Sequence, residues 1–108
     1  MAKHCAKLAE EKKGSDIKVI EIGELMPLAD YFVLITCTGH RHVIAIAHEI
    51  TKYLKEKKMP APSVEGGDKG WWYLLDLGAV IIHLFEEKAR SYYDFDSLWA
   101  DAGAIDWE

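Results

Sequence analysis

An uninterrupted apolar run, Tyr-Phe-Val-Leu-Ile-Thr at residues 31–36, constrains the fold of this chain more than any other feature. A run with no polar break is expected of a central strand that is buried on both faces. The longest periodic segment follows it, from about Arg41 to Lys57. Apolar residues recur there at spacings of three and four, which predicts an amphipathic helix. A buried strand leading into such a helix indicates an α/β domain with helices flanking a sheet.

The rest of the chain adds alternating strand and helix patterns to this pair. The predicted elements are a helix at 2–13 ended by Gly14, a strand at 16–22, the strand at 31–36, the helix at 41–57, a loop at 57–70, two strands within 71–85 around a turn at 76–78, and a closing helix that breaks near Asp94 before a short turn carrying Leu98 and Trp99. The loop is expected because that stretch holds two prolines and three glycines.

These elements have the order α-β-β-α-β-β-α and form one domain over residues 1–108. The strand–helix–strand crossover at 31–76 predicts a parallel pair, and the hairpin that follows adds an antiparallel strand, which makes the sheet mixed. A two-residue hairpin loop would place Trp72 opposite His83, and a three-residue loop with a bulge would place Trp71 there. Both registers put a tryptophan beside that histidine.

The charge composition of the chain limits which classes of molecule are expected to bind it. The 108 residues include 13 Lys and Arg against 18 Asp and Glu, a formal net charge of −5. An acidic domain is expected to meet a basic protein surface, with no nucleic acid as its main contact. Cys5 and Cys37 are too few for a disulfide framework, and no apolar stretch approaches the roughly 20 residues that span a bilayer. A cytoplasmic protein without a membrane contact is therefore expected.

The stretch Thr-Cys-Thr-Gly-His-Arg-His at 36–42 is the most metal-like part of the sequence. A zinc site needs four ligands in tetrahedral reach. Cys37 and His40 could converge, but His42 and His48 are expected on different sides of the helix start. We therefore expect Thr38 to cap the helix, the histidines to face solvent, and no metal to bind.

Three other kinds of chemistry have little support in the sequence: phosphate binding, carboxylate-based catalysis and nucleophilic catalysis. Phosphate binding at the 36–42 turn would rest on one glycine and Arg41, without a Walker lysine. Asp94 and Asp96 are expected to cap the last helical turn, and no Asp-x-Asp pair lies on a predicted strand. No nucleophile elbow is present. The sequence predicts neither a catalytic centre nor a cofactor.

Aromatic side chains are the distinctive feature of the last third of the chain. The cluster consists of Trp71, Trp72, Tyr73, His83, Phe85, Tyr92, Tyr93, Phe95 and Trp99. Alternate residues of a strand face opposite ways, so both tryptophans cannot enter the same core. Tryptophan and tyrosine are enriched at interface hot spots. The cluster therefore predicts an interaction surface.

A series of motifs runs through nearly the whole chain, from about residue 5 to residue 102. The segments are DIKVIEI (16–22), ADYFVLIT (29–36), RHVIAIAHEI (41–50), EGGDKGWWYLLDLGAVIIHLF (65–85), ARSYYDFDSLW (89–99) and ADA (100–102). The most specific motifs are Asp30-Tyr31-Phe32, Glu65-Gly66 with Trp72 and Leu75-Asp76-x-Gly78, His83-x-Phe85 with Arg90 and Tyr93, and Leu98-Trp99. Together they resemble the ribosomal silencing factor family, also called RsfS or Iojap.

The resemblance implies a core similar to a nucleotidyl transferase without the catalytic acids, and no enzymatic activity. It implies a homodimer that binds the large ribosomal subunit through its protein fourteen, on the face that meets the small subunit. Occupying that surface would block subunit joining and repress translation. The partner-binding residues that the resemblance implies are Trp72, Leu75, Asp76, His83, Phe85 and Tyr93. Asp30, Tyr31 and Phe32 match an architectural motif.

The chain departs from the family pattern at one turn. The family pattern there is roughly T-G-x-S-x-R, whereas this chain has Cys37 and Gly39 at the glycine and serine positions. Trp71 is an addition beside the matching Trp72. Two alternatives to silencing remain: a nucleotide-binding or nucleotidyl-transferring enzyme that uses the 36–42 turn, and a factor that assembles the large subunit.

Overall fold

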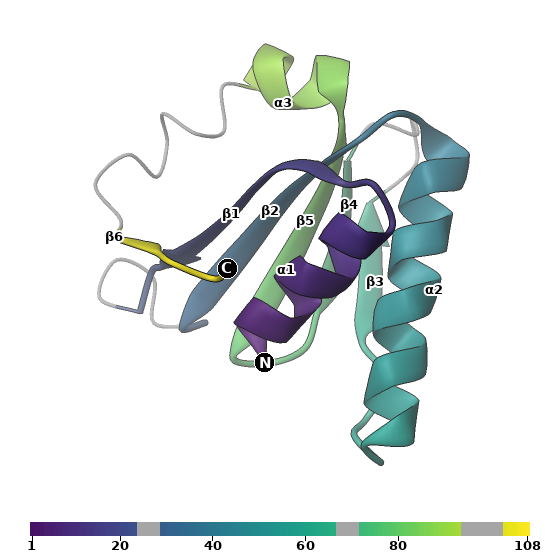
Figure 1. Ribbon diagram of the computed structural model, residues 1–108, viewed down its shortest axis with the longest axis vertical. Helices are drawn as coiled ribbons and strands as arrows, with labels where there is room; N and C mark the ends of the chain where they lie inside the picture. Colours follow the sequence, from purple (N-terminus) through teal and green to yellow (C-terminus); the bar gives the residue numbers. More distant parts are fainter. Residues whose placement is uncertain (24–28, 67–71, 94–102) are drawn as a thin grey trace.

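The computed structural model describes residues 1–23, 29–66, 72–93 and 103–108. The elements in these ranges are α1 (Ala2–Glu11), β1 (Ser15–Glu21), β2 (Tyr31–Cys37), α2 (His40–Glu56), β3 (Ser63–Gly66), β4 (Trp72–Asp76), β5 (Val80–Glu86), α3 (Glu87–Tyr93) and β6 (Gly103–Ile105). They form a mixed sheet flanked by helices (Figure 1), which confirms the predicted α/β class.

The strands lie in the order β3-β4-β5-β2-β1-β6. β2 and β5 form a parallel pair at the centre, in register from Tyr31 with Val80 to Cys37 with Glu86. The other neighbouring strands pair antiparallel. β2 and β5 are buried along nearly their whole length, as the uninterrupted apolar run predicts.

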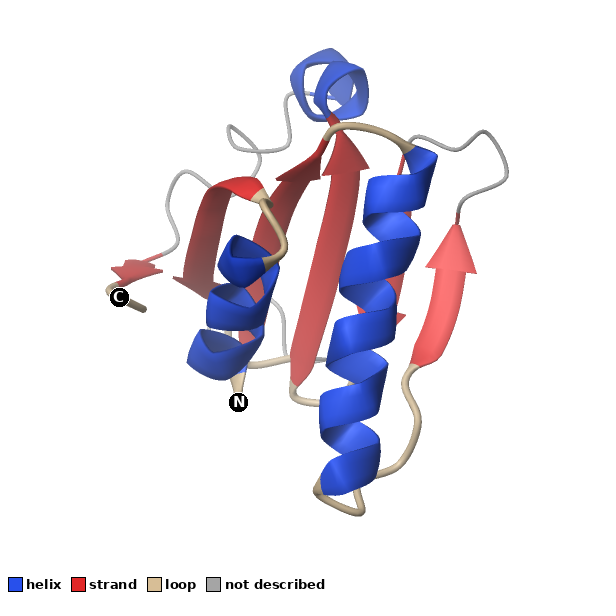
Figure 2. Cartoon of the chain, turned by 45° about the vertical axis from the view of Figure 1, so that its right-hand side comes forward, coloured by secondary structure: helices blue, strands red, loops and turns tan. Residues whose placement is uncertain are grey.

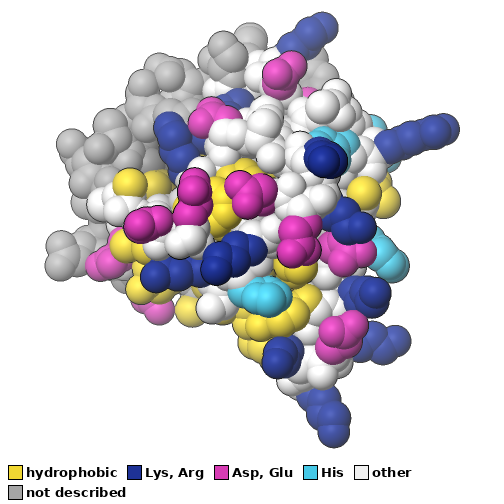
Figure 3. All heavy atoms as spheres, in the orientation of Figure 1, with side chains coloured by type: hydrophobic (Ala, Val, Ile, Leu, Met, Phe, Trp, Pro, Cys, Tyr) yellow, Lys and Arg dark blue, Asp and Glu magenta, His cyan; other side chains and the backbone are white. Residues whose placement is uncertain are grey.

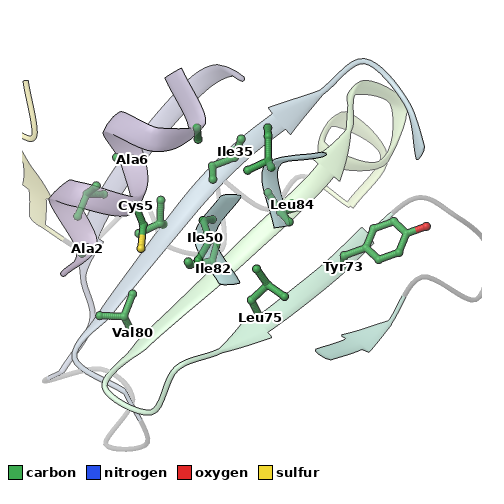
Figure 4. Close-up of a cluster of buried hydrophobic side chains, with 14 of the residues drawn as sticks. Ala2, Cys5, Ala6, Ile35, Ile50, Tyr73, Leu75, Val80, Ile82 and Leu84 are labelled. Atoms are coloured by element: carbon green, nitrogen blue, oxygen red, sulfur yellow. The ribbon is translucent and has the colours of Figure 1, made fainter. Parts of the chain in front are cut away.

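The helices α1 and α2 cover one face of the sheet, here called the helical face (Figures 1 and 2). The buried residues of α2 are Val43, Ile46, Ile50 and Leu54, at the spacing of an amphipathic helix. They belong to one apolar cluster with strand residues that include Ile35, Leu75, Ile82 and Leu84 (Figure 4). Burying each large apolar side chain contributes about 1.5–3 kcal/mol, so this cluster holds α2 against the strands.

The opposite side of the sheet, here called the distal face, carries a second apolar cluster. Its buried members on the strands include Phe32, Leu34, Ile81 and Phe85. Ala89 of α3 is also buried in this cluster. The end of the distal face is therefore covered by α3 among the described elements.

Arg90 fastens α3 to the strands. Its side chain is 5% exposed. Nη1 donates to the backbone oxygen of Asp16 at 2.5 Å and to Oγ1 of Thr36 at 2.8 Å. Nη2 lies 3.6 Å from a carboxylate oxygen of Asp16, which is largely exposed. A buried guanidinium needs such hydrogen bonds to offset its loss of hydration, so the position of α3 is tied to β1 and β2.

The structure adds two strands to the predicted order. β3 lies inside the stretch expected to be a loop, and β6 follows the closing helix. Both are short and lie at the two edges of the sheet. All residues of β3 are exposed, so it has no alternating apolar pattern and pairs with β4 through its backbone. The predicted break near Asp94 and the turn with Leu98 and Trp99 lie outside the described residues.

The predicted parallel partner of β2 was wrong. The prediction paired it with the first strand after the helix, but β4 instead pairs with β3 and β5, and β5 takes the place beside β2. The burial of the two strands explains why β5, and not β4, lies beside β2. β4 alternates between partly exposed and buried residues, whereas β5 is buried from Val80 to Phe85. The more continuously apolar strand occupies the centre, where both faces are covered.

Both predicted hairpin registers were also wrong. Asp76 pairs with Ile81, and the Leu77 N–H donates to the oxygen of Val80 at 2.9 Å, so residues 78 and 79 form the tip of the turn. Gly78 adopts a φ of 94° there. Trp72 therefore pairs with Phe85 and Leu74 with His83. A shift of two residues keeps every side chain on its face, so Trp72 still lies beside His83 as predicted.

Candidate functional site

The β4 strand places one half of its side chains on the distal face. Trp72, Leu74 and Asp76 are partly exposed, whereas Tyr73 and Leu75 are buried on the helical face. This follows from the two-residue period of a strand. Trp72 and Leu74 pack at the border of the buried distal cluster. They form its accessible edge among the described residues.

Trp72 is held in place by aromatic neighbours. Its Nε1–H donates to Nδ1 of His83 at 3.2 Å. Its ring stacks on His83 and Phe85 at centroid distances of 5.8 and 5.6 Å. Phe32 meets the His83 ring edge-on at 4.4 Å. A tryptophan fixed in this way presents a large side chain with little rotational entropy left to lose on binding.

His83 is uncharged at neutral pH. Its side chain is 3% exposed, and burial lowers its pKa from 6.5 to about 3. Because Nδ1 accepts the hydrogen bond from Trp72, the neutral ring carries its proton on Nε2. Among aromatic rings the neutral imidazole therefore acts as a fixed acceptor that orients the indole.

The outer border of this surface is acidic. Ser63 pairs with Asp76 and Glu65 with Leu74, so the side chains of Ser63 and Glu65 lie on the distal face. Glu65 is exposed, and a carboxylate oxygen of Asp76 accepts from the Gly78 N–H at 2.8 Å. Neither β3 nor β4 contains a lysine or arginine. We call Ser63, Glu65, Trp72, Leu74 and Asp76 the β3–β4 surface.

The structure separates the residues that the sequence predicts to bind a partner. Trp72, Asp76, His83 and Phe85 share the distal face, but His83 and Phe85 are buried behind Trp72. Leu75 is 1% exposed and packs beneath the helices. Tyr93 is the last residue of α3, and its side chain and Trp71 lie outside the described residues.

Leu74 is a surface residue that the sequence interpretation did not select. It lies two positions after Trp72 on the same strand, so the period-two rule was the signal that could have identified it. The same rule places Leu74 and Leu75 on opposite faces of the sheet. The family motif points to Leu75 as a partner-binding residue.

The 36–42 turn is organised by histidine and not by the predicted threonine cap. α2 begins at His40 with Gly39 as its N-cap, and no side chain caps it. The Thr38 N–H donates to Nδ1 of His42 at 2.9 Å, and the other ring nitrogen of His42 donates to the Lys12 oxygen at 2.7 Å. The Thr38 prediction was wrong because His42, one turn into the helix, reaches back to the Thr38 amide and to the end of α1.

The other residues of the proposed metal set do not share one environment. Cys37 is buried, and burial together with Glu86 raises the pKa of its thiol to about 12. His40 and His48 are exposed, and the His40 ring bonds to the Tyr73 hydroxyl. Among the described residues, no group of three or more His, Cys, Asp or Glu side chains could hold a metal ion.

The described helices are also too short or too polar to cross a membrane.

A protein-family model matches the chain over all of residues 1–108. Its description is "Ribosomal silencing factor during starvation", or RsfS. Curated relatives carry related names. Ribosomal silencing factor RsfS of Bacillus subtilis is 35% identical over 104 residues, covering 96% of this chain and 88% of the relative. The factor of the same name from Halalkalibacterium halodurans is 31% identical, covering 92% of this chain and 85% of the relative.

A mouse protein named "Mitochondrial assembly of ribosomal large subunit protein 1" is also similar. It is 34% identical over 95 residues, which cover 85% of this chain and 42% of the mouse protein.

Solved structures share the fold. A crystal structure of a protein from Bacillus halodurans superposes with a TM-score of 0.79 at 26% identity, covering 94% of this chain and 92% of that one. A protein from Chromobacterium violaceum gives the same TM-score at 32% identity, covering 93% and 87%.

Proposed function

The chain belongs to the ribosomal silencing factor family, and from this membership we propose that it binds the large ribosomal subunit and prevents the small subunit from joining it. The proposed consequence is repression of translation. The mechanism is steric exclusion, which requires affinity and bulk but no bond making or breaking. We accordingly propose a regulatory factor and not an enzyme.

We propose that the β3–β4 surface is the docking site for ribosomal protein fourteen. The observation that carries this proposal is Trp72, which is partly exposed yet fixed by His83 and Phe85. A rigid, partly exposed tryptophan is the residue type most enriched at hot spots. Glu65 and Asp76 beside it favour a basic partner. Proteins that bind ribosomal RNA carry basic surfaces, because they neutralise phosphates.

The predicted partner-binding residues take different roles in this proposal. Trp72 and Asp76 contact the partner, together with Leu74. His83 and Phe85 act from behind by holding the indole. Leu75 supports the strand from the helical face. Tyr93 remains a proposed contact from α3.

Co-sedimentation with isolated large subunits, small subunits and joined ribosomes tests the proposal. We expect binding to large subunits and fewer joined ribosomes after remixing. Trp72→Ala should weaken binding by about 2 kcal/mol or more. Its matched control is Val64→Ala, which removes an apolar side chain that is 63% exposed on β3 and points to the helical face, away from the β3–β4 surface. The control should bind like the wild type.

Circular dichroism keeps this test interpretable. Because Trp72 is only partly buried, the Trp72→Ala variant should stay folded. Wild-type affinity in a folded Trp72→Ala variant would contradict the docking site. Unfolding of the variant would show that Trp72 is core, and the assigned interface would be wrong.

Assembly of the large subunit is a second candidate function. The name of the mouse relative favours it. The two functions differ in their target, since a silencing factor must bind mature subunits whereas an assembly factor acts on immature ones. Binding to mature large subunits with blocked joining supports silencing. Binding only to precursor particles supports assembly.

A nucleotide-binding enzyme is the remaining alternative. It predicts a thermal shift on adding nucleotide and magnesium, whereas both ribosome functions predict none. The Thr38 amide at the proposed phosphate turn already donates to His42, which disfavours this alternative. The resemblance also predicts a homodimer, which sedimentation equilibrium of the purified chain tests.

A further inference from the structure

The second long helix carries a positive charge that contrasts with the rest of the chain. The helix α2 contains three Lys and Arg against two Glu, and Lys57 and Lys58 follow its end, so residues 40–58 have a net charge of +3, whereas the whole chain carries −5. Opposite charges are normally interspersed on a solvated surface, so this local excess of positive charge distinguishes the α2 region from the rest of the chain.

The basic residues of α2 lie on one side of the helix. Arg41, His48, Lys52 and Lys55 fall within about 60° of one another at 100° per residue, and all four are exposed. This stripe points away from the buried Val43–Leu54 side, so it faces outward from the sheet. It extends about 21 Å along the helix at 1.5 Å per residue. Figure 3 shows Lys and Arg side chains projecting along the right-hand flank, where α2 lies.

The two glutamates of α2 take different positions relative to this stripe. Glu49 lies on the flank that faces α1, whereas Glu56 lies one turn after Lys52 at the C-terminal end of the helix. Glu49 pairs there with Lys12 at 3.5 Å, and Tyr53 on the same flank stacks on His4. Within the described part of the chain, no carboxylate forms an ion pair with Arg41, Lys52 or Lys55. Their charges are therefore available to an external anion.

We propose that this α2 stripe binds the phosphate backbone of ribosomal RNA on the large subunit. The inference rests on the proposed function for its target, but it concerns another surface. The β3–β4 surface lies on the distal face and α2 lies on the helical face, so the two can be occupied together. An acidic surface meets a basic protein, and a basic helix meets RNA. The domain would lie between protein on one side and RNA on the other.

The test measures affinity for purified large subunits over a series of salt concentrations. Each phosphate contact that a protein neutralises adds about 1 to the slope of log K against log salt. The variant Lys52→Gln/Lys55→Gln removes two charges while keeping good helix formers. We expect a slope smaller by about 2, so that the affinities are similar at about 1 M salt and the variant binds roughly a hundredfold more weakly at about 0.1 M.

The matched control is Lys3→Gln/Lys7→Gln. It makes the same charge change at exposed positions of α1, the other helix on the same face. We expect at most a small effect. An equal loss in both variants would overturn the proposal, because the effect would then come from net charge. An unchanged salt slope in the α2 variant would also overturn it.

A second measurement separates the two surfaces. Isolated ribosomal protein fourteen should bind wild type and the α2 variant equally, because the RNA is absent. A loss there would overturn the proposal by placing the stripe in the protein contact. If Trp72→Ala weakens subunit binding and the α2 variant does not, only the RNA contact fails. If wild type binds no large subunit at all, the proposed function itself fails.

Discussion

His83 shows how one buried residue can serve both the fold and the proposed binding surface. Its ring lies between Phe32 and Trp72, and its Nδ1 fixes the indole that reaches the surface. A charged imidazolium in this place would lose its hydration and could no longer accept from Trp72. The neutral form is therefore part of the native structure.

This dependence gives a prediction for pH. Burial lowers the folded-state pKa of His83 to about 3, below the ordinary 6.5 of the unfolded chain. Between these values the unfolded state binds a proton that the folded state does not. The stabilising contribution is thus complete above pH 6.5 and is lost as the pH falls towards 3, at about 1.4 kcal/mol per pH unit.

Urea unfolding between neutral and mildly acidic pH measures this effect. His83→Phe keeps a buried ring but removes the titrating group, so its free energy of unfolding should fall less steeply than that of wild type below pH 6.5. The matched control is His48→Gln at an exposed position, which should follow wild type. Parallel curves for wild type and His83→Phe would contradict a neutral buried His83.

At the scale of elements, the sequence predicted what apolar periodicity encodes. The buried strand at 31–36 and the helix at 41–57 correspond to β2 and α2 within a residue. The edge strand β3 was missed because all its side chains are exposed, so only backbone pairing defines it. The hairpin register depends on the turn conformation at Gly78. The apolar pattern determines which face of the sheet each side chain occupies. It does not distinguish pairing registers that differ by two residues, because these keep every side chain on the same face.

The candidate site was predictable to the same extent. The neighbourhood of Trp72 and His83 followed from any register that kept both on one face. The burial of His83 and Phe85 did not, because it depends on which strands become central. Leu75 was selected from a motif, and only the alternation of β4 separates it from the exposed side. Motifs identify a region, whereas packing decides which of its residues a partner can reach.

Substitutions at two glycines test how closely β3 must approach β4. Gly66 has a φ of 84°, and a Cβ there would lie 2.5 Å from the backbone oxygen of Trp72. Gly78 has a φ of 94°, but a Cβ there would meet nothing within 4 Å. Gly78→Ala should cost about 1–2 kcal/mol from backbone strain alone. Gly66→Ala should cost more and separate β3 from β4.

Urea unfolding and amide hydrogen exchange distinguish these outcomes. Faster exchange at the paired amides of β3 and β4 in Gly66→Ala, with near-normal exchange in Gly78→Ala, is the expected result. Because β3 carries Glu65, the Gly66→Ala variant should also bind large subunits less tightly. Equal costs and equal exchange in the two variants would mean that the close approach to Trp72 does not hold β3 in place.

At the scale of the whole molecule, the domain has two surfaces of opposite charge on opposite sides of one sheet. The acidic residues Glu65 and Asp76 lie on the distal face, and the basic stripe of α2 lies outside the helical face. The sheet and its two apolar clusters keep these surfaces apart. If both surfaces bind the large subunit as proposed, the domain needs no conformational change to exclude the small subunit.

Steric exclusion by such a spacer makes a quantitative prediction about competition. The domain measures 34 × 27 × 26 Å, so under the proposed mechanism we expect that a small subunit does not close over a bound copy. Binding of the two must then be mutually exclusive. The apparent dissociation constant of this protein for large subunits should rise linearly with the concentration of small subunits, without a plateau. Fluorescence anisotropy of the labelled protein measures it. A plateau would reveal a complex in which the large subunit binds this protein and the small subunit together. Such a complex would contradict steric exclusion.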